Sequence, residues 1–162
     1  MKDVWVTDAN VFIDVDDMEL VDEFCQLGHR IFTTSFVWAE VNTSNDSWRK
    51  YIKLGKLVIE NLSSKDRLEA LSLREGNLSE ADTSVLWMAI QKQQILLTGE
   101  KKLRSLAMKN QVEVHGTLWI LDRLVNQSIL SNAHACEALK TLMKVNIRLP
   151  KVECQQRMNH WC

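Results

Sequence analysis

Four acidic residues stand near the ends of apolar runs or the starts of helical segments, where carboxylates can gather and do chemistry. Asp8 directly follows the run VWVT, and Glu100 follows ILLTG. Glu40 lies one turn past a predicted helix start, and Asp82 lies in the first turn of another. Unpaired carboxylates that share a cleft repel one another and raise their pKa values, whereas a bound divalent cation reverses that effect. We therefore predict that these four acids form a Mg²⁺ or Mn²⁺ site.

The elements that must position these acids alternate between strands and helices. Apolar runs predict strands that begin near residues 4, 31, 95 and 112, and a weaker fifth strand over residues 57–59. Amphipathic segments separate them. This alternation predicts a three-layer α/β fold with a central, mostly parallel sheet of four to five strands. Ligands bind at the carboxyl edge of such sheets, and the four acids all fall near that edge.

Each acid also has an ordinary structural explanation. Ser79 and Asp82 match a capping box, which is as good an explanation as a metal site. Glu40 could lie on a solvated helix face, and Glu100 could interact with a helix dipole. Asp8 is harder to explain in this way, because Asn10 is expected to cap the helix that follows it.

Several neighbouring polar residues could support the site. Asn10 is expected to be a helix cap, with contact to a metal ligand as the alternative role. Thr98 could cap a helix or hold a metal-bound water. Lys101, Lys102 and Arg104 could form a solvated helix face, or could bind phosphates beside the acids.

The composition indicates a globular protein. The chain has 162 residues and is 46% hydrophobic with six Trp, which favours a single domain with a sizeable core. We assign residues 1–150 to that domain and residues 151–162 to a C-terminal tail that can hold a short helix. The net charge of −1 gives no sign of nucleic-acid binding, so such a role needs a local basic patch.

The cysteines and the N-terminus point to a cytoplasmic protein. Cys25, Cys136, Cys154 and Cys162 form no C-x-x-C pair, and the chain starts without the apolar segment of a signal peptide. We therefore expect reduced thiols. No stretch is long and apolar enough to suggest a membrane span, so no membrane partner is expected.

Taken together, these motifs resemble the PIN-domain nucleases, which include toxin subunits of type II toxin–antitoxin pairs. The resemblance lies in VTDANVFI (6–13), TSFVWAE (34–40), LSEAD (78–82), LLTGEKKLR (96–104) and VEVHGT (112–117), in the family's order. Each motif is weak alone, and the set is fairly specific. One position departs from the family, because Thr98-Gly99-Glu100 has Glu where Asp is usual. The extra methylene shifts the carboxylate by about one carbon–carbon bond, and Mg²⁺ is strict about geometry.

The resemblance implies a metal-dependent endoribonuclease that hydrolyses RNA. Asp8 and Asp82 would be the main ligands of Mg²⁺ or Mn²⁺, and Glu40 and Glu100 would bind the metal directly or through water. Lys101, Lys102 or Arg104 would steady the RNA backbone. A toxin of this kind would form a homodimer and would be silenced by a small antitoxin protein.

Two other functions remain as alternatives. A PIN-like scaffold with a decayed site could act as a nucleic-acid or protein binding module, and the Glu at position 100 keeps that alternative open. A phosphatase of the haloacid-dehalogenase type also places an Asp after its first strand. That chemistry needs a second acid two residues later as proton donor, and here the residue is Asn10.

Overall fold

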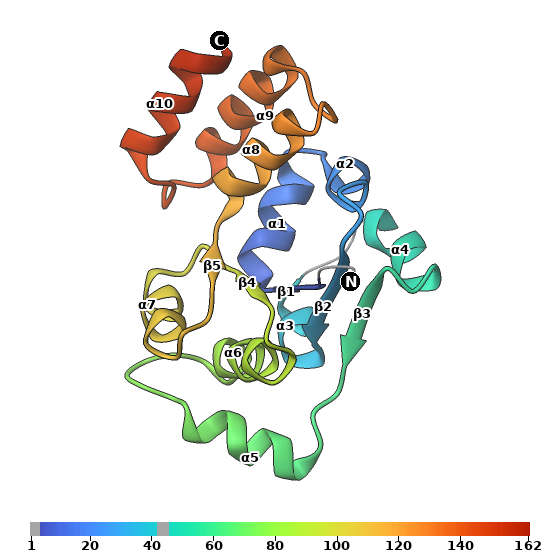
Figure 1. The fold of residues 1–162 in the computed structure, drawn as a ribbon, viewed down its shortest axis with the longest axis vertical. Helices are drawn as coiled ribbons and strands as arrows, with labels where there is room; N and C mark the ends of the chain where they lie inside the picture. Colours follow the sequence, from blue (N-terminus) through green and yellow to red (C-terminus); the bar gives the residue numbers. More distant parts are fainter. Residues whose placement is uncertain (1–3, 42–45) are drawn as a thin grey trace.

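The computed structural model describes residues 4–41 and 46–162, and its centre is a five-stranded parallel sheet (Figure 1). The strands are β1 (Val4–Thr7), β2 (Arg30–Thr34), β3 (Leu57–Glu60), β4 (Ile95–Leu97) and β5 (Val114–His115), in the order β3-β2-β1-β4-β5. The predicted α/β fold is confirmed. The weakly predicted strand is β3, which pairs with β2 from Ile31↔Leu57 to Thr34↔Glu60.

Helices cover the sheet on both sides, which gives the three layers visible in Figure 1. One layer holds α1 (Ala9–Asp17), α2 (Val21–Cys25), α8 (Thr117–Asn126), α9 (Asn132–Val145) and α10 (Lys151–Trp161). The other holds α3 (Ser35–Glu40), α5 (Ser64–Ser72), α6 (Glu80–Lys92) and α7 (Lys101–Lys109). The short helices η1 (Asp46–Trp48) and α4 (Arg49–Lys53) precede β3.

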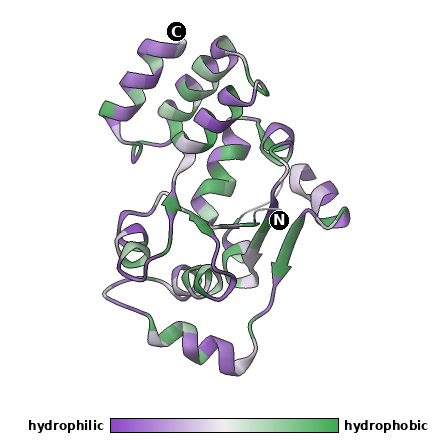
Figure 2. Cartoon of the chain, in the orientation of Figure 1, coloured by the Kyte–Doolittle hydropathy of each residue, from purple (hydrophilic) through white to green (hydrophobic). Residues whose placement is uncertain are grey.

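Apolar side chains from the sheet and from the helices on either side form one core. Val6 in β1 and Leu96 in β4 are fully buried. Phe12 of α1 packs edge-on against Trp48, with ring centroids 5.0 Å apart. Figure 2 shows the same distribution, since hydrophobic colour gathers on the strands and α1 while α5 and α10 carry much hydrophilic colour. Packing on both faces of the sheet therefore sets the positions of the strand ends.

The strand order reverses at β1, in the centre of the sheet. β1 lies at the centre, with β2 on one side and β4 on the other. The chain leaves β1 toward β2 and β3, then crosses back through α5 and α6 to form β4. Ligands in open α/β sheets bind where the strand order reverses in this way. Here that position lies between the ends of β1 and β4.

The C-terminal segment folds back onto the domain as α10, which packs against α9. A disulfide joins Cys136 in α9 to Cys162, with their Cα atoms 5.5 Å apart. The prediction that all four cysteines are reduced thiols is therefore wrong for this pair, whose 26-residue separation in sequence hides their proximity. Cys25 and Cys154 are free and buried. Within residues 4–41 and 46–162, no helix combines the length and apolar character needed to cross a membrane.

Candidate active site

Asp8 lies at the carboxyl end of β1 and is 2% exposed. Its Oδ1 accepts a hydrogen bond from the backbone N–H of Ala9 at 2.7 Å. Its Oδ2 accepts one at 2.9 Å from the hydroxyl of Thr98, which directly follows the neighbouring strand β4. Asp8 is also the N-cap of α1, so the prediction that Asn10 caps this helix is wrong. The helix begins two residues earlier than expected, because the extended backbone of Asp8 already turns its side chain toward the first helical N–H.

The environment of Asp8 disfavours its negative charge. Burial is the main cause that raises the pKa of Asp8, to about 6. The hydrogen bond from Thr98 and that from Ala9 act in the opposite direction, while the negative charges of Asp82 and Glu40 raise the pKa of Asp8 further. Two of the predicted acids therefore lie close enough to Asp8 to affect its ionisation.

Asp82 lies in the first turn of α6 and takes part in the predicted capping box. Its Oδ2 accepts from the backbone N–H of Ser79, while the Ser79 hydroxyl accepts from the N–H of Asp82, both at 3.0 Å. The hydroxyls of Ser84 and Thr34 lie 2.7 Å apart and join α6 to the end of β2. This contact holds the start of α6, and with it Asp82, at the carboxyl edge of the sheet.

Glu40 is the last residue of α3, the helix that directly follows β2. Thr34 caps this helix, since its hydroxyl accepts a hydrogen bond from the N–H of Val37 at 3.2 Å. Loss of surrounding water is the main cause that raises the pKa of Glu40, and the negative charge of Asp82 adds to it. Asp8, Glu40 and Asp82 thus form an electrostatically linked group.

Glu100 lies at the same edge of the sheet but has a different partner. It precedes α7, and its backbone N–H donates to the hydroxyl of Thr98 at 3.0 Å. Its Oε2 lies 3.9 Å from Nη1 of Arg148, in the connection between α9 and α10. Thr98 therefore contacts both Asp8 and the backbone of Glu100, and its predicted role beside a metal stays a prediction.

The chemistry of this donor set fits a hard divalent cation. The candidate ligands are all carboxylate oxygens, which Mg²⁺ and Mn²⁺ prefer, and a cation would offset the repulsion among Asp8, Glu40 and Asp82. In the described part of the chain, however, no three Asp, Glu, His or Cys side chains come close enough to ligate one ion as they stand. Binding would therefore need side-chain movements, which are open to the exposed Glu40 and the half-buried Glu100.

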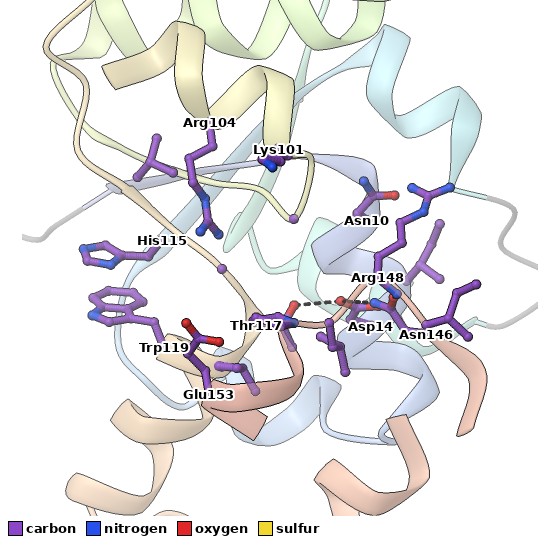
Figure 3. Close-up of a pocket in the computed structure, with 18 of the residues that line it drawn as sticks. Asn10, Asp14, Lys101, Arg104, His115, Thr117, Trp119, Asn146, Arg148 and Glu153 are labelled. Carbon is purple, nitrogen blue, oxygen red and sulfur yellow. Dashed lines mark hydrogen bonds between the residues drawn. The ribbon is translucent and has the colours of Figure 1, made fainter. Parts of the chain in front are cut away.

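A cavity of about 940 Å³ lies between α7, α1 and the α9–α10 connection (Figure 3). None of Asp8, Glu40, Asp82 and Glu100 is among its lining residues. Asn10 and Gly99, the neighbours of the acidic positions, form part of its wall. Of the predicted basic residues, Lys101 and Arg104 line the cavity, and Lys102 is not among the lining residues. Asn10 therefore borders the cavity, although it does not cap α1.

A polar network on the cavity wall was not predicted from the sequence. Asp14 is 5% exposed and accepts hydrogen bonds from the Thr117 hydroxyl at 2.8 Å and from Nδ2 of Asn146 at 2.9 Å. A sequence signal existed, because Asp14 falls between Val11 and Val15 on the apolar face of its helix. Nothing local in the sequence indicated that Asn146, 132 residues away, would be its partner.

Comparisons with known proteins agree with the fold. A family model described as a PIN domain (DUF3368) matches residues 4–161. A PilT N-terminus domain protein from the hyperthermophilic archaeon Sulfolobus solfataricus P2 has a similar structure, with a TM-score of 0.53 and 12% sequence identity, over 75% of this chain and 93% of that chain. A search of curated proteins found no match. Since the family match spans nearly the whole chain, this protein belongs to the PIN domain family, whose members are typically nucleases that use divalent metals.

Proposed function

We propose that this protein is a divalent-metal-dependent endoribonuclease that hydrolyses phosphodiester bonds of RNA. The observation that carries the proposal is Asp8, a nearly buried carboxylate whose pKa is raised to about 6 by burial and further by Asp82 and Glu40. Such an arrangement destabilises the protein unless a cation offsets the charge. Asp8 also lies at the carboxyl ends of the neighbouring strands β1 and β4, where the strand order reverses and where α/β folds bind their ligands.

In this proposal each residue of the site has a separate role. Asp8 and Asp82 would hold Mg²⁺ or Mn²⁺, and Glu40 and Glu100 would complete the site directly or through water. The ion would polarise the scissile phosphate and make water a better nucleophile. The Thr98 hydroxyl and the Ala9 N–H fix both oxygens of Asp8 in place, so this carboxylate is oriented before substrate arrives. In-line attack by water would release a 5′-phosphate and a 3′-hydroxyl.

The test is incubation of labelled single-stranded RNA with Mg²⁺ or Mn²⁺. We expect cleavage by the wild type, no cleavage in EDTA, and a loss of more than about 100-fold for Asp8→Asn, because contacts one step behind a metal ligand are already worth 10- to 100-fold. Glu137→Gln removes a carboxylate from the exposed face of α9 and should leave the rate unchanged. Cleavage that survives both chelation and Asp8→Asn would refute the mechanism.

We further propose that the nuclease is the toxin of a toxin–antitoxin pair, active as a homodimer. Exposed apolar side chains at the cavity, Ile13, Met108, Val145 and Ile147, are 39% to 89% exposed, and they support a protein partner on this face. Expression of the wild type should arrest bacterial growth, and expression of Asp8→Asn should not. Normal growth at matched expression of the wild type would argue against a toxin.

A catalytically decayed binding module is the second candidate. It draws support from Glu100, which faces Arg148, and from the lack of three converging ligand side chains among the described residues. Thermal unfolding with and without Mn²⁺ separates the two candidates. A nuclease should gain stability from Mn²⁺ and lose that gain in Asp8→Asn, whereas a decayed site should respond equally in both proteins.

A further inference from the structure

We propose that Arg148 binds a phosphate of the nucleic-acid strand, and that Asn146 and Asp14 position it for this role. The inference rests on the proposed function, since it takes a nucleic acid as the ligand. It adds a residue from the C-terminal region, far in sequence from the acids, to the substrate-binding surface.

The first observation is the location of Arg148. Its guanidinium lies 3.9 Å from the carboxylate of Glu100, and its side chain is 71% exposed. Figure 3 shows Arg148 reaching along the cavity toward Asn10, while Lys101 and Arg104 extend from α7 on another wall. A phosphate in this cavity would therefore meet cationic groups from two separate elements.

The second observation is the ion pairing of the cavity's arginines. Arg157 is held by Asp122 through contacts of 2.7 and 3.0 Å. Arg148 has one long ion pair of 3.9 Å, and Arg104 forms no ion pair with any described residue, donating instead to the Thr98 carbonyl at 3.5 Å. A long, exposed ion pair contributes little free energy. Arg148 and Arg104 can therefore take a phosphate oxygen at low cost, and a guanidinium fork suits phosphate geometry.

The third observation is the network that holds the backbone of Arg148. The N–H of Arg148 donates to Oδ1 of Asn146 at 2.9 Å, while Nδ2 of Asn146 donates to Asp14. Asp14 is buried in α1 and also accepts from Thr117 at the start of α8. These hydrogen bonds connect the segment between α9 and α10 to α1, the helix that Asp8 caps. These hydrogen bonds already restrict the backbone of Arg148 in the free protein. Binding of a phosphate therefore costs less conformational entropy.

The test measures binding without cleavage. Asp8→Asn serves as the parent, in EDTA, and fluorescence anisotropy reports its affinity for a labelled single-stranded RNA oligonucleotide over a range of salt concentrations. One lost phosphate contact on a single strand lowers the slope of log affinity against log salt by about 0.7, which corresponds to about fivefold in affinity at 0.1 M salt. We expect both changes for Arg148→Gln. Arg148→Lys, which keeps the charge, should retain the slope and lose only part of the affinity.

Matched controls separate this role from a general loss of charge or of folding. Arg30→Gln removes the same charge from the amino end of β2, at the opposite edge of the sheet, and should change neither quantity. Asn146→Ala should weaken binding in the parent but add nothing to Arg148→Gln, since Asn146 acts through Arg148. Equal effects of Arg148→Gln and Arg30→Gln would overturn the assignment of Arg148 alone. Absence of any binding by the parent would overturn the nucleic-acid function as well.

Discussion

Asp8 shows how one residue can serve both the fold and the site. It caps α1 and is also the most deeply buried of the four predicted ligands. Its location was predicted correctly from the apolar run before it. The supporting reason was wrong, because Asp8, and not Asn10, supplies the cap. Sequence can place a carboxylate at a strand end, but it cannot tell which nearby polar group meets the first helical N–H.

The raised pKa of Asp8 predicts that Asp8→Asn stabilises the metal-free protein. The pKa is about 6 in the folded protein, against 3.8 for an unperturbed aspartate side chain. Between pH 4 and 6 the folded protein therefore holds a proton that the unfolded chain releases. The free energy of unfolding falls as pH rises through this window, by about 3 kcal/mol for two pKa units. We expect Asp8→Asn to be more stable than wild type at pH 8 by up to about 3 kcal/mol, and equally stable near pH 4.

Urea unfolding in EDTA at both pH values measures this difference. Glu137→Gln, which removes an exposed carboxylate, should follow the wild type at each pH. A variant Asp8→Asn that is less stable than wild type at pH 8 would show that the hydrogen bonds to the ionised carboxylate outweigh its burial.

At the scale of helices and strands, threonine and serine hydroxyls align the site. Thr33 in β2 donates to the carbonyl of Thr7 in β1 at 2.7 Å, and the Thr34 and Ser84 hydroxyls connect β2 to α6. The strands and the capping box of α6 were predictable, because periodicity and capping act within about ten residues. The contacts between hydroxyls of different elements depend on how those elements pack, and the sequence gives no local sign of them.

The capping box allows the structural role of α6 to be separated from its role in the site. Ser79→Ala removes a cap hydrogen bond but no metal ligand, so we expect about 1 kcal/mol loss of stability and retained Mn²⁺ binding. Asp82→Asn keeps a side-chain acceptor for the Ser79 N–H, so it should lose less stability but lose Mn²⁺ binding. Unfolding curves together with Mn²⁺ titration followed by electron paramagnetic resonance would measure both. Equal Mn²⁺ affinity in the two variants would remove Asp82 from the site.

At the scale of the whole molecule, the C-terminal helices complete the cavity. The connection between α9 and α10 supplies Arg148 and Asn146 to the cavity wall, although both follow the last strand by about thirty residues. The sheet and its acidic edge follow from local patterns in the first two thirds of the chain. The contacts that attach the C-terminal helices could not be predicted from the sequence. The hydrogen-bonded pair Asp14–Asn146 and the disulfide Cys136–Cys162 are brought together only by the completed fold.

The disulfide predicts that reduction weakens the whole molecule. A cross-link that closes a 26-residue loop restricts the unfolded chain and stabilises the fold by up to about 3.5 kcal/mol. We expect Cys136→Ser to unfold at lower urea than the oxidised wild type, and dithiothreitol to lower the wild type to the level of the variant. The variant itself should not respond to dithiothreitol, since the free Cys25 and Cys154 are buried.

Because α9 and α10 flank the connection that carries Arg148, reduction should also weaken RNA binding by the Asp8→Asn parent. Reduction should have little effect on RNA binding once Arg148 of that parent is replaced by Gln. If reduction instead weakened both proteins equally, the disulfide would act on binding through a part of the surface other than Arg148.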